Sequence, residues 1–388
     1  MMKRHLFPTI LLVSALGCLV SGVAVSAGDL RASPEIAGCD YMFTGPVEEG
    51  DAQRIEEMIP AKYDGSRLCF DSPGGNFVEG LRMFHTIWNK DSVATYVRSG
   101  DGCHSACAIA FLGGSVVVGT GAIRSRNAVI EPGARLGFHA PRLVLDEGSD
   151  HSSKEVEDAY AWALQSASHL FDLTQIAEHG ARGMTSFLFS RTLATPPEAM
   201  YEIDTIGKAS LSQIDVALVP VPEITWGSMR HVCDTGYVMV DDRFAWIDSA
   251  EKAFSVFSDQ GSDGSGNPIA LADRVWSWTA DSFSYFVIRG YPAPHVNEGF
   301  CMVSMSHYAW DRENALPLEQ KDPTSAFQVT FWNDAHVPLD RSLASYAETN
   351  TRADHILSVA WYALWSPEQP LHPHAVRGGH TEGPARRT

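Results

Sequence analysis

Short apolar runs alternate with amphipathic stretches along the first half of the sequence. Residues 67–70 are predicted to form a buried strand that ends at the turn Ser72-Pro73-Gly74-Gly75, and the apolar residues at 77–89 recur with helical spacing. The small apolar residues at 105–112 predict a buried helix. Strands that alternate with helices in this order predict an α/β layer fold with parallel pairing.

A histidine follows a later strand of this half. Residues 128–139 combine a Glu131-Pro132-Gly133 turn with a short strand that reaches His139. Residues 152–179 then predict a long amphipathic helix, with Ser152 or Ser153 as its cap and acidic residues in its first turn.

The pattern changes beyond about residue 225. Four segments rich in aromatic and β-branched residues predict a smaller, mainly antiparallel β domain, and they lie at 237–247, 275–289, 300–310 and 327–332. A helix at 342–364 is expected to close this domain. The sequence therefore divides into an α/β domain at 28–222, a β-rich domain at 223–366 and a tail at 367–388, whose composition predicts disorder.

The first 27 residues are typical of an export signal. Lys3 and Arg4 precede an apolar run that ends in the small residues Val25-Ser26-Ala27. The mature protein is therefore expected to be periplasmic or secreted. An uncleaved membrane anchor and a lipid attached at Cys18 are the alternatives.

Composition and charge narrow the class of protein. The 388 residues are 45% hydrophobic and 20% charged, which suits two domains with their own cores. The net charge is 29 minus 47, or −18, and it becomes 27 minus 47, or −20, without the first 27 residues. Because an acidic protein repels phosphate backbones, no nucleic-acid partner is expected.

The cysteines predict disulfides. Seven cysteines become six when Cys18 leaves with the signal, and six in an exported protein suggest bridges, although 15 pairings are possible. The set that we favour pairs Cys39 with Cys69, Cys103 with Cys107, and Cys233 with Cys301. A metal held by Cys103, His104 and Cys107 is the alternative, but the spacing lacks the second pair of a zinc ribbon, so no metal or cofactor is expected.

Three segments carry residues that suit acyl transfer. The backbone N–H groups of Gly74 and Gly75 can approach a ligand closely, because glycine has no side chain, and so form part of an oxyanion hole. Ser105 precedes a helix, where the N–H of Ala106 is a second donor and the helix dipole favours negative charge. His139 lies just beyond a strand, where it can act as the base for Ser105.

With these residues, the segment from about 68 to 141 resembles the proteolytic subunit of the Clp protease and related serine peptidases of the ClpP/crotonase superfamily. It is similar in particular to exported bacterial ClpP-like proteins with a Cys-x-Ser-x-Cys nucleophile segment. The resemblance implies a stacked βα core over 38–221, with Ser105 as the nucleophile and His139, in a His-x-Pro context, as the base. The longer interval between these two residues predicts an extra hairpin within 115–131.

The sequence departs from that family at the third catalytic residue. The resemblance places the orienting acid within 193–204, and Asp204 is our choice there. A Ser-His dyad, or a main-chain carbonyl in place of the acid, is the alternative. His104 is a second candidate base, but neighbours in sequence at a turn generally point apart, which favours His139.

The leading functional hypothesis is an exported serine peptidase that acts on peptides or unfolded chains, without an ATPase partner, because ATP is cytoplasmic. A hypothesis from another class is an inactive ClpP-like scaffold that binds a partner through its β domain. An acyl-CoA hydrolase or isomerase and a Ser-Lys dyad with Lys154 or Lys208 are further alternatives. The family resemblance also suggests a homo-oligomer built through the helix at 152–179. The alternative, which we favour, is that Trp162, Leu164, Leu170 and Phe171 of this helix pack within the same chain, against its own core or the β domain.

Overall fold

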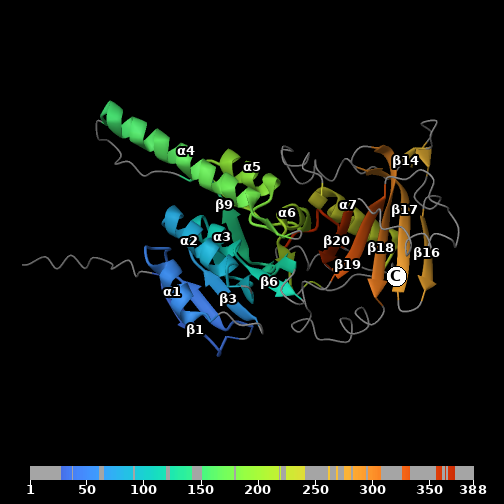
Figure 1. Ribbon diagram of the computed structural model, residues 1–388, viewed down its shortest axis with the longest axis horizontal. Helices are drawn as coiled ribbons and strands as arrows, with labels where there is room; N and C mark the ends of the chain where they lie inside the picture. The colour runs from blue at the N-terminus through green and yellow to red at the C-terminus, as the bar shows by residue number, and fades with distance from the viewer. Residues whose placement is uncertain are drawn as a thin grey trace, which may run out of the picture.

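The computed structural model describes residues 28–36, 38–60, 65–90, 92–118, 123–141, 151–178, 181–217, 219, 224–240, 261–262, 268–269, 275–280, 283–293, 296–306, 326–332, 355–360, 363 and 366–371. Within these ranges the chain forms a mixed α/β layer followed by an antiparallel sheet (Figure 1). The predicted export signal lies outside the described residues.

A mostly parallel sheet organises the first half of the chain. Its strands are β1 (Asp29–Ala32), β2 (Tyr41–Thr44), β3 (Ser66–Asp71), β4 (Ser92–Val97), β6 (Ser115–Val118), β7 (Ile123–Arg126), β8 (Ala128–Ile130) and β13 (Asp215–Val216). The central pairs β2–β3, β3–β4, β4–β8 and β8–β13 are parallel. The pairs β1–β2, β4–β6 and β6–β7 are antiparallel, and β6 and β7 form the hairpin expected within 115–131.

Side chains that alternate between the two faces of the sheet form two separate apolar clusters. Phe43 and Phe70 belong to a large apolar cluster, together with Phe84 from the second helix. Their chain neighbours Met42 and Cys69 belong to a smaller cluster, as expected when successive side chains point to opposite faces. The large cluster also holds buried residues of three helices: α1 (Asp51–Met58), α2 (Phe77–Trp88) and α3 (Ala106–Phe111).

A second sheet of three strands carries the candidate chemistry. β5 (Gly102–His104) pairs in parallel with β9 (Arg135–Phe138), and β9 pairs antiparallel with β12 (Tyr201–Glu202). β5 leads directly into α3, and β9 ends next to His139. The strands and helices expected around the candidate residues are therefore present.

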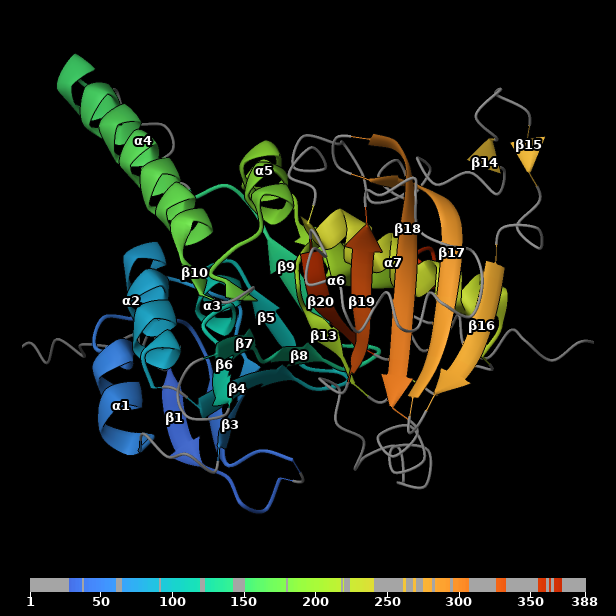
Figure 2. The ribbon, with the colours of Figure 1, turned by 45° about the vertical axis from the view of Figure 1, so that its right-hand side comes forward.

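The helix α4 (Ser153–Gln175) projects from the layer (Figures 1 and 2). Ser152 and Glu155 form a capping box at its start. Leu170 is buried in the main core, and Trp162 packs edge-on against Phe77 with 6.1 Å between ring centroids. This part of α4 therefore contacts the α/β half. Within the described ranges, no helix is both long and apolar enough to cross a bilayer.

Three disulfides join Cys39 to Cys69, Cys103 to Cys107, and Cys233 to Cys301, with Cα–Cα distances of 5.8, 5.3 and 6.0 Å. These are the pairs favoured from the sequence. Such bridges persist in oxidising compartments, so they indicate an extracellular or periplasmic environment.

The C-terminal half holds a five-stranded antiparallel sheet. Its strands pair in chain order: β16 (Val275–Ala280), β17 (Phe283–Ala293), β18 (Val296–Ser306), β19 (Ala326–Trp332) and β20 (His355–Ala360). The helix α7 (Trp226–Val240) lies against this sheet, and the Cys233–Cys301 disulfide joins it to β18 (Figure 2). The mainly antiparallel sheet expected in this half is therefore present.

Two predictions of secondary structure in this half are wrong. Residues 237–240, expected in a strand, are the last turn of α7, because the helix continues through the buried Gly236 instead of breaking there. Residues 355–360, expected within a helix at 342–364, form β20, whose backbone pairs with β19 along its whole length. A short apolar run is compatible with either a helix or a strand, and pairing with the edge of a neighbouring strand makes it a strand.

The chain returns to the α/β half after the sheet, where a disordered tail was expected from residue 367. Leu371 is buried in the main core, its N–H donates to the Asp204 carbonyl (2.8 Å), and its carbonyl accepts from the Gly133 N–H (2.7 Å). At the start of α6 (Ile206–Leu211), the first N–H donates to the Gln369 carbonyl (3.1 Å). Residues 367–371 are therefore held by backbone partners, contrary to the expectation for this part of the tail, and 372–388 lie outside the described residues.

Candidate active site

Three chain segments meet at the ends of β3, β5 and β9. The Ser72 N–H donates to the Gly102 carbonyl (2.6 Å), and the Ser72 carbonyl accepts from the His104 N–H (3.1 Å). On the other side, the Ser105 N–H donates to the Gly137 carbonyl (3.0 Å). The glycine turn (residues 72–75), the serine turn (residues 103–107) and the segment that precedes His139 therefore lie side by side.

Ser105 has an unusual backbone conformation. It lies between β5 and α3 with φ 56° and ψ −123°, a region that residues other than glycine rarely occupy. Its side chain does not cap α3. The polar caps of the other helices are extended and do accept a hydrogen bond from their own helix: Asn76, Ser152, Thr185 and Thr205. Ser105 is therefore not a capping serine, and a strained strand-to-helix turn is an arrangement that exposes a nucleophilic hydroxyl.

The disulfide between Cys103 and Cys107 brackets this serine. Cys103 belongs to β5, Cys107 belongs to α3, and both are completely buried. The bond therefore joins the strand to the helix on either side of Ser105 and restricts the backbone of the turn. Because both sulfur atoms are bonded to each other, neither is available as a thiolate ligand for the metal site considered from the sequence.

The two glycines lie directly against the serine turn. Gly74 and Gly75 have φ 93° and 151°, and a Cβ atom on Gly74 would lie 2.8 Å from the Ser105 Cβ and 3.2 Å from the Ala106 nitrogen. Only glycine fits so close an approach. In the part of the chain that the structure describes, neither the Gly75 N–H nor the Ala106 N–H donates a hydrogen bond. Two unpaired donors next to a serine suit an oxyanion hole.

His139 has a ring orientation that suits a base. Its Nδ1 lies 2.8 Å from the carbonyl oxygen of Ala140. Because a carbonyl only accepts, we assign the ring hydrogen to Nδ1, which leaves the lone pair on Nε2. The Ala140 N–H in turn donates to the Thr195 carbonyl (2.9 Å), just after α5 (Ser186–Ala194). A main-chain carbonyl thus holds the imidazole in the tautomer that accepts a proton at Nε2.

Ser105 and His139 line the same pocket, which has a volume of about 260 Å³. Its other walls are mostly apolar and include Pro73, Phe77, Ile109, Phe138, Leu170 and Pro197. Gly75 also lines it. The sequence segments that carry the candidate nucleophile, the candidate base and one candidate oxyanion donor therefore converge on a single cavity.

His104 is placed differently. It is paired with Gly137 across β5 and β9, and a Cβ atom on Gly137 would lie 3.0 Å from its Cδ2, so the ring lies over Gly137. It is not among the residues that line the pocket. Burial lowers the pKa of His104, the positive charge of Arg135 adds to this effect, and Glu202 opposes it. His104 is therefore a neutral neighbour of the site, and its position favours His139 as the base.

The Asp204 carboxylate has another partner. One of its oxygen atoms lies 2.6 Å from Nζ of Lys208, one turn along α6. The hydrogen bond that an orienting acid would accept from His139 goes instead to the Ala140 carbonyl. Of the alternatives left open by the sequence, this geometry favours a dyad supported by a main-chain carbonyl.

Sequence reasoning missed the residues behind the glycine turn. Val47 forms an isolated parallel bridge with Gly75: its N–H donates to the Gly74 carbonyl and its carbonyl accepts from the Asn76 N–H, each at 2.8 Å. Glu79 in turn binds the segment that follows Val47. Nothing in the pattern of the sequence signals a contact across some 30 residues.

Comparison with known proteins adds no assignment. No family model matches this sequence, and no curated protein matches it. Within the described ranges, no group of three or more His, Cys, Asp or Glu side chains could hold a metal ion.

Proposed function

We propose that the protein is an exported serine hydrolase of the peptidase type, with Ser105 as its nucleophile and His139 as its base. The observation that carries this proposal is the backbone of Ser105, a positive-φ, non-capping serine that shares a pocket with His139. Backbone strain of this kind costs about 1–3 kcal/mol and is concentrated at functional sites. The N–H groups of Gly75 and Ala106, which donate no hydrogen bond within the described residues, support the same proposal.

The reaction is acyl transfer to serine and then to water. His139 Nε2 takes the hydroxyl proton as Ser105 Oγ bonds to the carbonyl carbon, and the N–H groups of Gly75 and Ala106 bind the resulting oxyanion. The C–N bond breaks, and the amine leaves with the proton from His139. Water then adds to the acyl-enzyme and gives a proton to His139, and Ser105 recovers its hydrogen as the acid is released.

The surroundings of the pocket favour an extended polypeptide as substrate. The catalytic pocket has apolar walls that suit an apolar side chain. A more open hollow of about 440 Å³ shares Gly75 and Phe77 with it and continues to Arg82 and Trp162. Neighbouring residues of one chain could occupy both spaces, which agrees with peptides or unfolded proteins as substrates.

Labelling with a fluorophosphonate probe tests the proposal. The wild-type protein is expected to label, Ser105→Ala is expected not to label, and His139→Ala is expected to label far more slowly. Ser152→Ala is the matched control, because Ser152 is an exposed capping serine at the start of α4. Equal labelling of wild type and Ser105→Ala would overturn the proposal.

A catalytically inactive scaffold that binds a partner is the second candidate. The observation that favours it is the ion pair of Asp204 with Lys208, which leaves the site without a carboxylate on His139. A wild-type protein that fails to label, yet folds with its three disulfides intact, would favour this candidate.

A further inference from the structure

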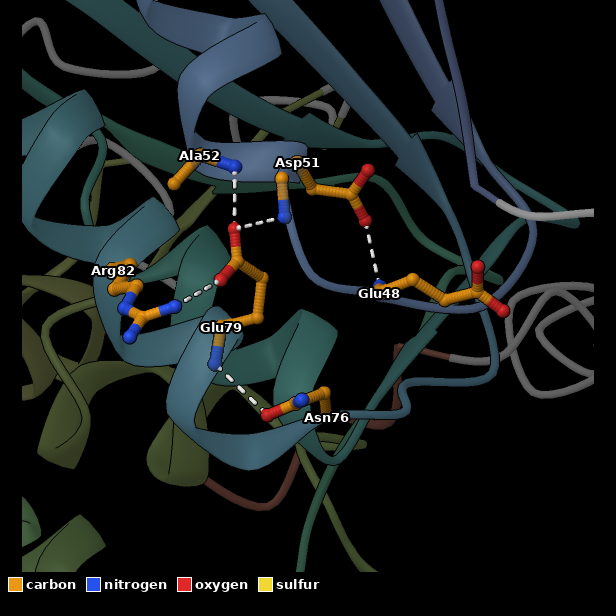
Figure 3. Close-up of polar contacts among 7 residues, drawn as sticks. Glu48, Asp51, Ala52, Asn76, Glu79 and Arg82 are labelled. Carbon is orange, nitrogen blue, oxygen red and sulfur yellow. Dashed lines mark hydrogen bonds and ion pairs between the residues drawn. The ribbon is translucent and has the colours of Figure 1, made fainter.

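Glu79 is a buried carboxylate in the first turn of α2, and its side chain is 2% exposed. Figure 3 shows it beneath the start of α1, where its Oε1 accepts from the Ala52 N–H (2.8 Å). The same oxygen also accepts from the Gly50 N–H (3.2 Å). Its Oε2 lies 3.1 Å from Nη1 of Arg82. A buried carboxylate costs several kcal/mol unless its partners compensate, so Glu79 is tied firmly to these groups.

Glu79 replaces a cap that α1 lacks. The N-cap position of α1 is Gly50, with φ 98° and no side chain to satisfy the first N–H groups of the helix. Asp51, completely buried, accepts from the Glu48 N–H at 2.8 Å (Figure 3). The two carboxylates together fix the backbone of residues 48–52.

This fixed segment leads directly to the glycine turn. Val47 immediately precedes it and bridges Gly75, and a Cβ atom on Gly75 would lie 2.9 Å from the Val47 nitrogen. On its other side the turn touches Ser105 through Gly74. The Gly75 peptide is thus held between Val47 and the serine turn, and Glu79 anchors the chain that carries Val47.

We propose that Glu79 is a positioning residue for the oxyanion-binding N–H of Gly75. The inference rests on the proposed function and extends it to a residue outside the pocket. An oxyanion donor acts on the transition state, so its misplacement lowers the rate of the chemical step and leaves the binding of the ground state unchanged. A purely structural residue would change the fraction of folded protein and leave the rate per intact site unchanged.

The test measures how fast a fluorophosphonate reacts with Ser105 at several probe concentrations. The rate is expressed per intact active site, counted by the amount of probe bound at completion. Glu79→Gln keeps one acceptor oxygen and is expected to lower the maximal inactivation rate by about 10-fold at an unchanged apparent binding constant. Glu79→Ala is expected to lower it further. The glutamine variant alone decides the question if the alanine variant does not fold.

Lys90→Met is the matched control. Lys90 is also a buried charge that joins the α2 region to α1, because its Nζ lies 3.0 Å from both the carbonyl and the carboxylate of Glu56. It lies beyond the far end of α2 and contacts the last turns of α1, so its loss should destabilise the helix pair without reaching Gly75. Hydrogen exchange of peptides that cover 45–52 and 72–77 is expected to accelerate in Glu79→Gln and not in Lys90→Met.

The outcomes separate the two proposals. An unchanged rate per site in Glu79→Gln, or an equal loss in Lys90→Met, overturns the positioning role alone. A wild-type protein that does not label at Ser105 overturns the proposed function and the positioning role with it.

Discussion

Gly74 and Ser105 are packed so closely that a Cβ atom on Gly74 would lie 2.8 Å from the Cβ atom of Ser105. Gly74→Ala is therefore expected to displace the serine turn and abolish fluorophosphonate labelling. Gly100→Ala is the matched control, because Gly100 has nearly the same φ, 90° against 93°, but nothing lies within 4 Å of its Cβ position. The control should lose only about 1–2 kcal/mol of stability and keep its labelling rate. Equal rates in the two variants would contradict the close packing.

The two disulfides of the α/β half should separate stability from activity. Cys39 and Cys69 are 30 residues apart, whereas Cys103 and Cys107 are 4 apart. By loop entropy, replacing the longer pair with alanines costs about 4 kcal/mol of unfolding free energy and replacing the shorter pair about 2 kcal/mol. Labelling of folded protein should nevertheless fall more in Cys103→Ala/Cys107→Ala, because that pair brackets Ser105. Denaturant unfolding and labelling rates of both double variants check this, and equal labelling would count against it.

The two histidines should behave differently. His139→Ala is expected to lower the labelling rate by about 10²–10⁴-fold, because it removes the proposed base. His104→Gln should keep most of the rate, since the ring lies over Gly137 and a lowered pKa keeps it neutral near pH 7. Asp204→Asn should also keep it, because that carboxylate pairs with Lys208. If His104→Gln lowered the labelling rate as much as His139→Ala, the assignment of His139 rather than His104 as the base would be contradicted.

Asp234 should make stability depend on pH. Burial raises its pKa well above 3.8, and the Arg230 guanidinium, 3.6 Å away, opposes this effect. A raised pKa in the folded state means that the contribution of Asp234 is fully present below pH 3.8 and is lost as pH rises through the raised value. The stability of Asp234→Asn relative to wild type should therefore increase with pH, by at most about 1.4 kcal/mol per unit. Urea unfolding of both proteins at a series of pH values from 3.8 upward tests this prediction. A difference in unfolding free energy that stays constant with pH would contradict it.

The returning C-terminal segment should stabilise the α/β half. Leu371 is 3% exposed and belongs to the main core, although it lies beyond the antiparallel sheet in sequence. Leu371→Ala is expected to cost about 2–5 kcal/mol of unfolding free energy. Leu164→Ala is the matched control, because Leu164 on α4 is 54% exposed. Comparable stability in the two variants would show that the return contact is dispensable.

Much of the α/β half could be predicted from the sequence, because there the local signals agree with the tertiary contacts. The helix α2 shows its apolar face at helical spacing, and the Ser72–Gly75 turn, Ser105 and His139 follow the ends of β3, β5 and β9. The positive φ of Ser105 could not be predicted, since a serine before a helix is normally an extended cap. The roles of Ala140 and Glu79 depend on contacts between distant segments, which no local pattern encodes.

The C-terminal half was predicted less accurately for the same reason. Residues 355–360 have no strong intrinsic preference, and pairing with β19 makes them a strand. Residues 237–240 were expected in a strand, yet α7 continues through them. Leu371 lies in a stretch with the composition of a disordered tail, and it is ordered because Gly133 and Asp204 provide backbone partners.

The contact between Leu371 and Gly133 also imposes an order on assembly. The Gly133 turn immediately precedes β9, and β9 ends next to His139, so the turn that leads into this strand has its backbone partner only when residue 371 is in place. During synthesis from the N-terminus, Ser105 is made long before residue 371. The whole antiparallel sheet is made between them. Nascent chains of this protein would thus carry the proposed nucleophile for much of their elongation without the finished site around it.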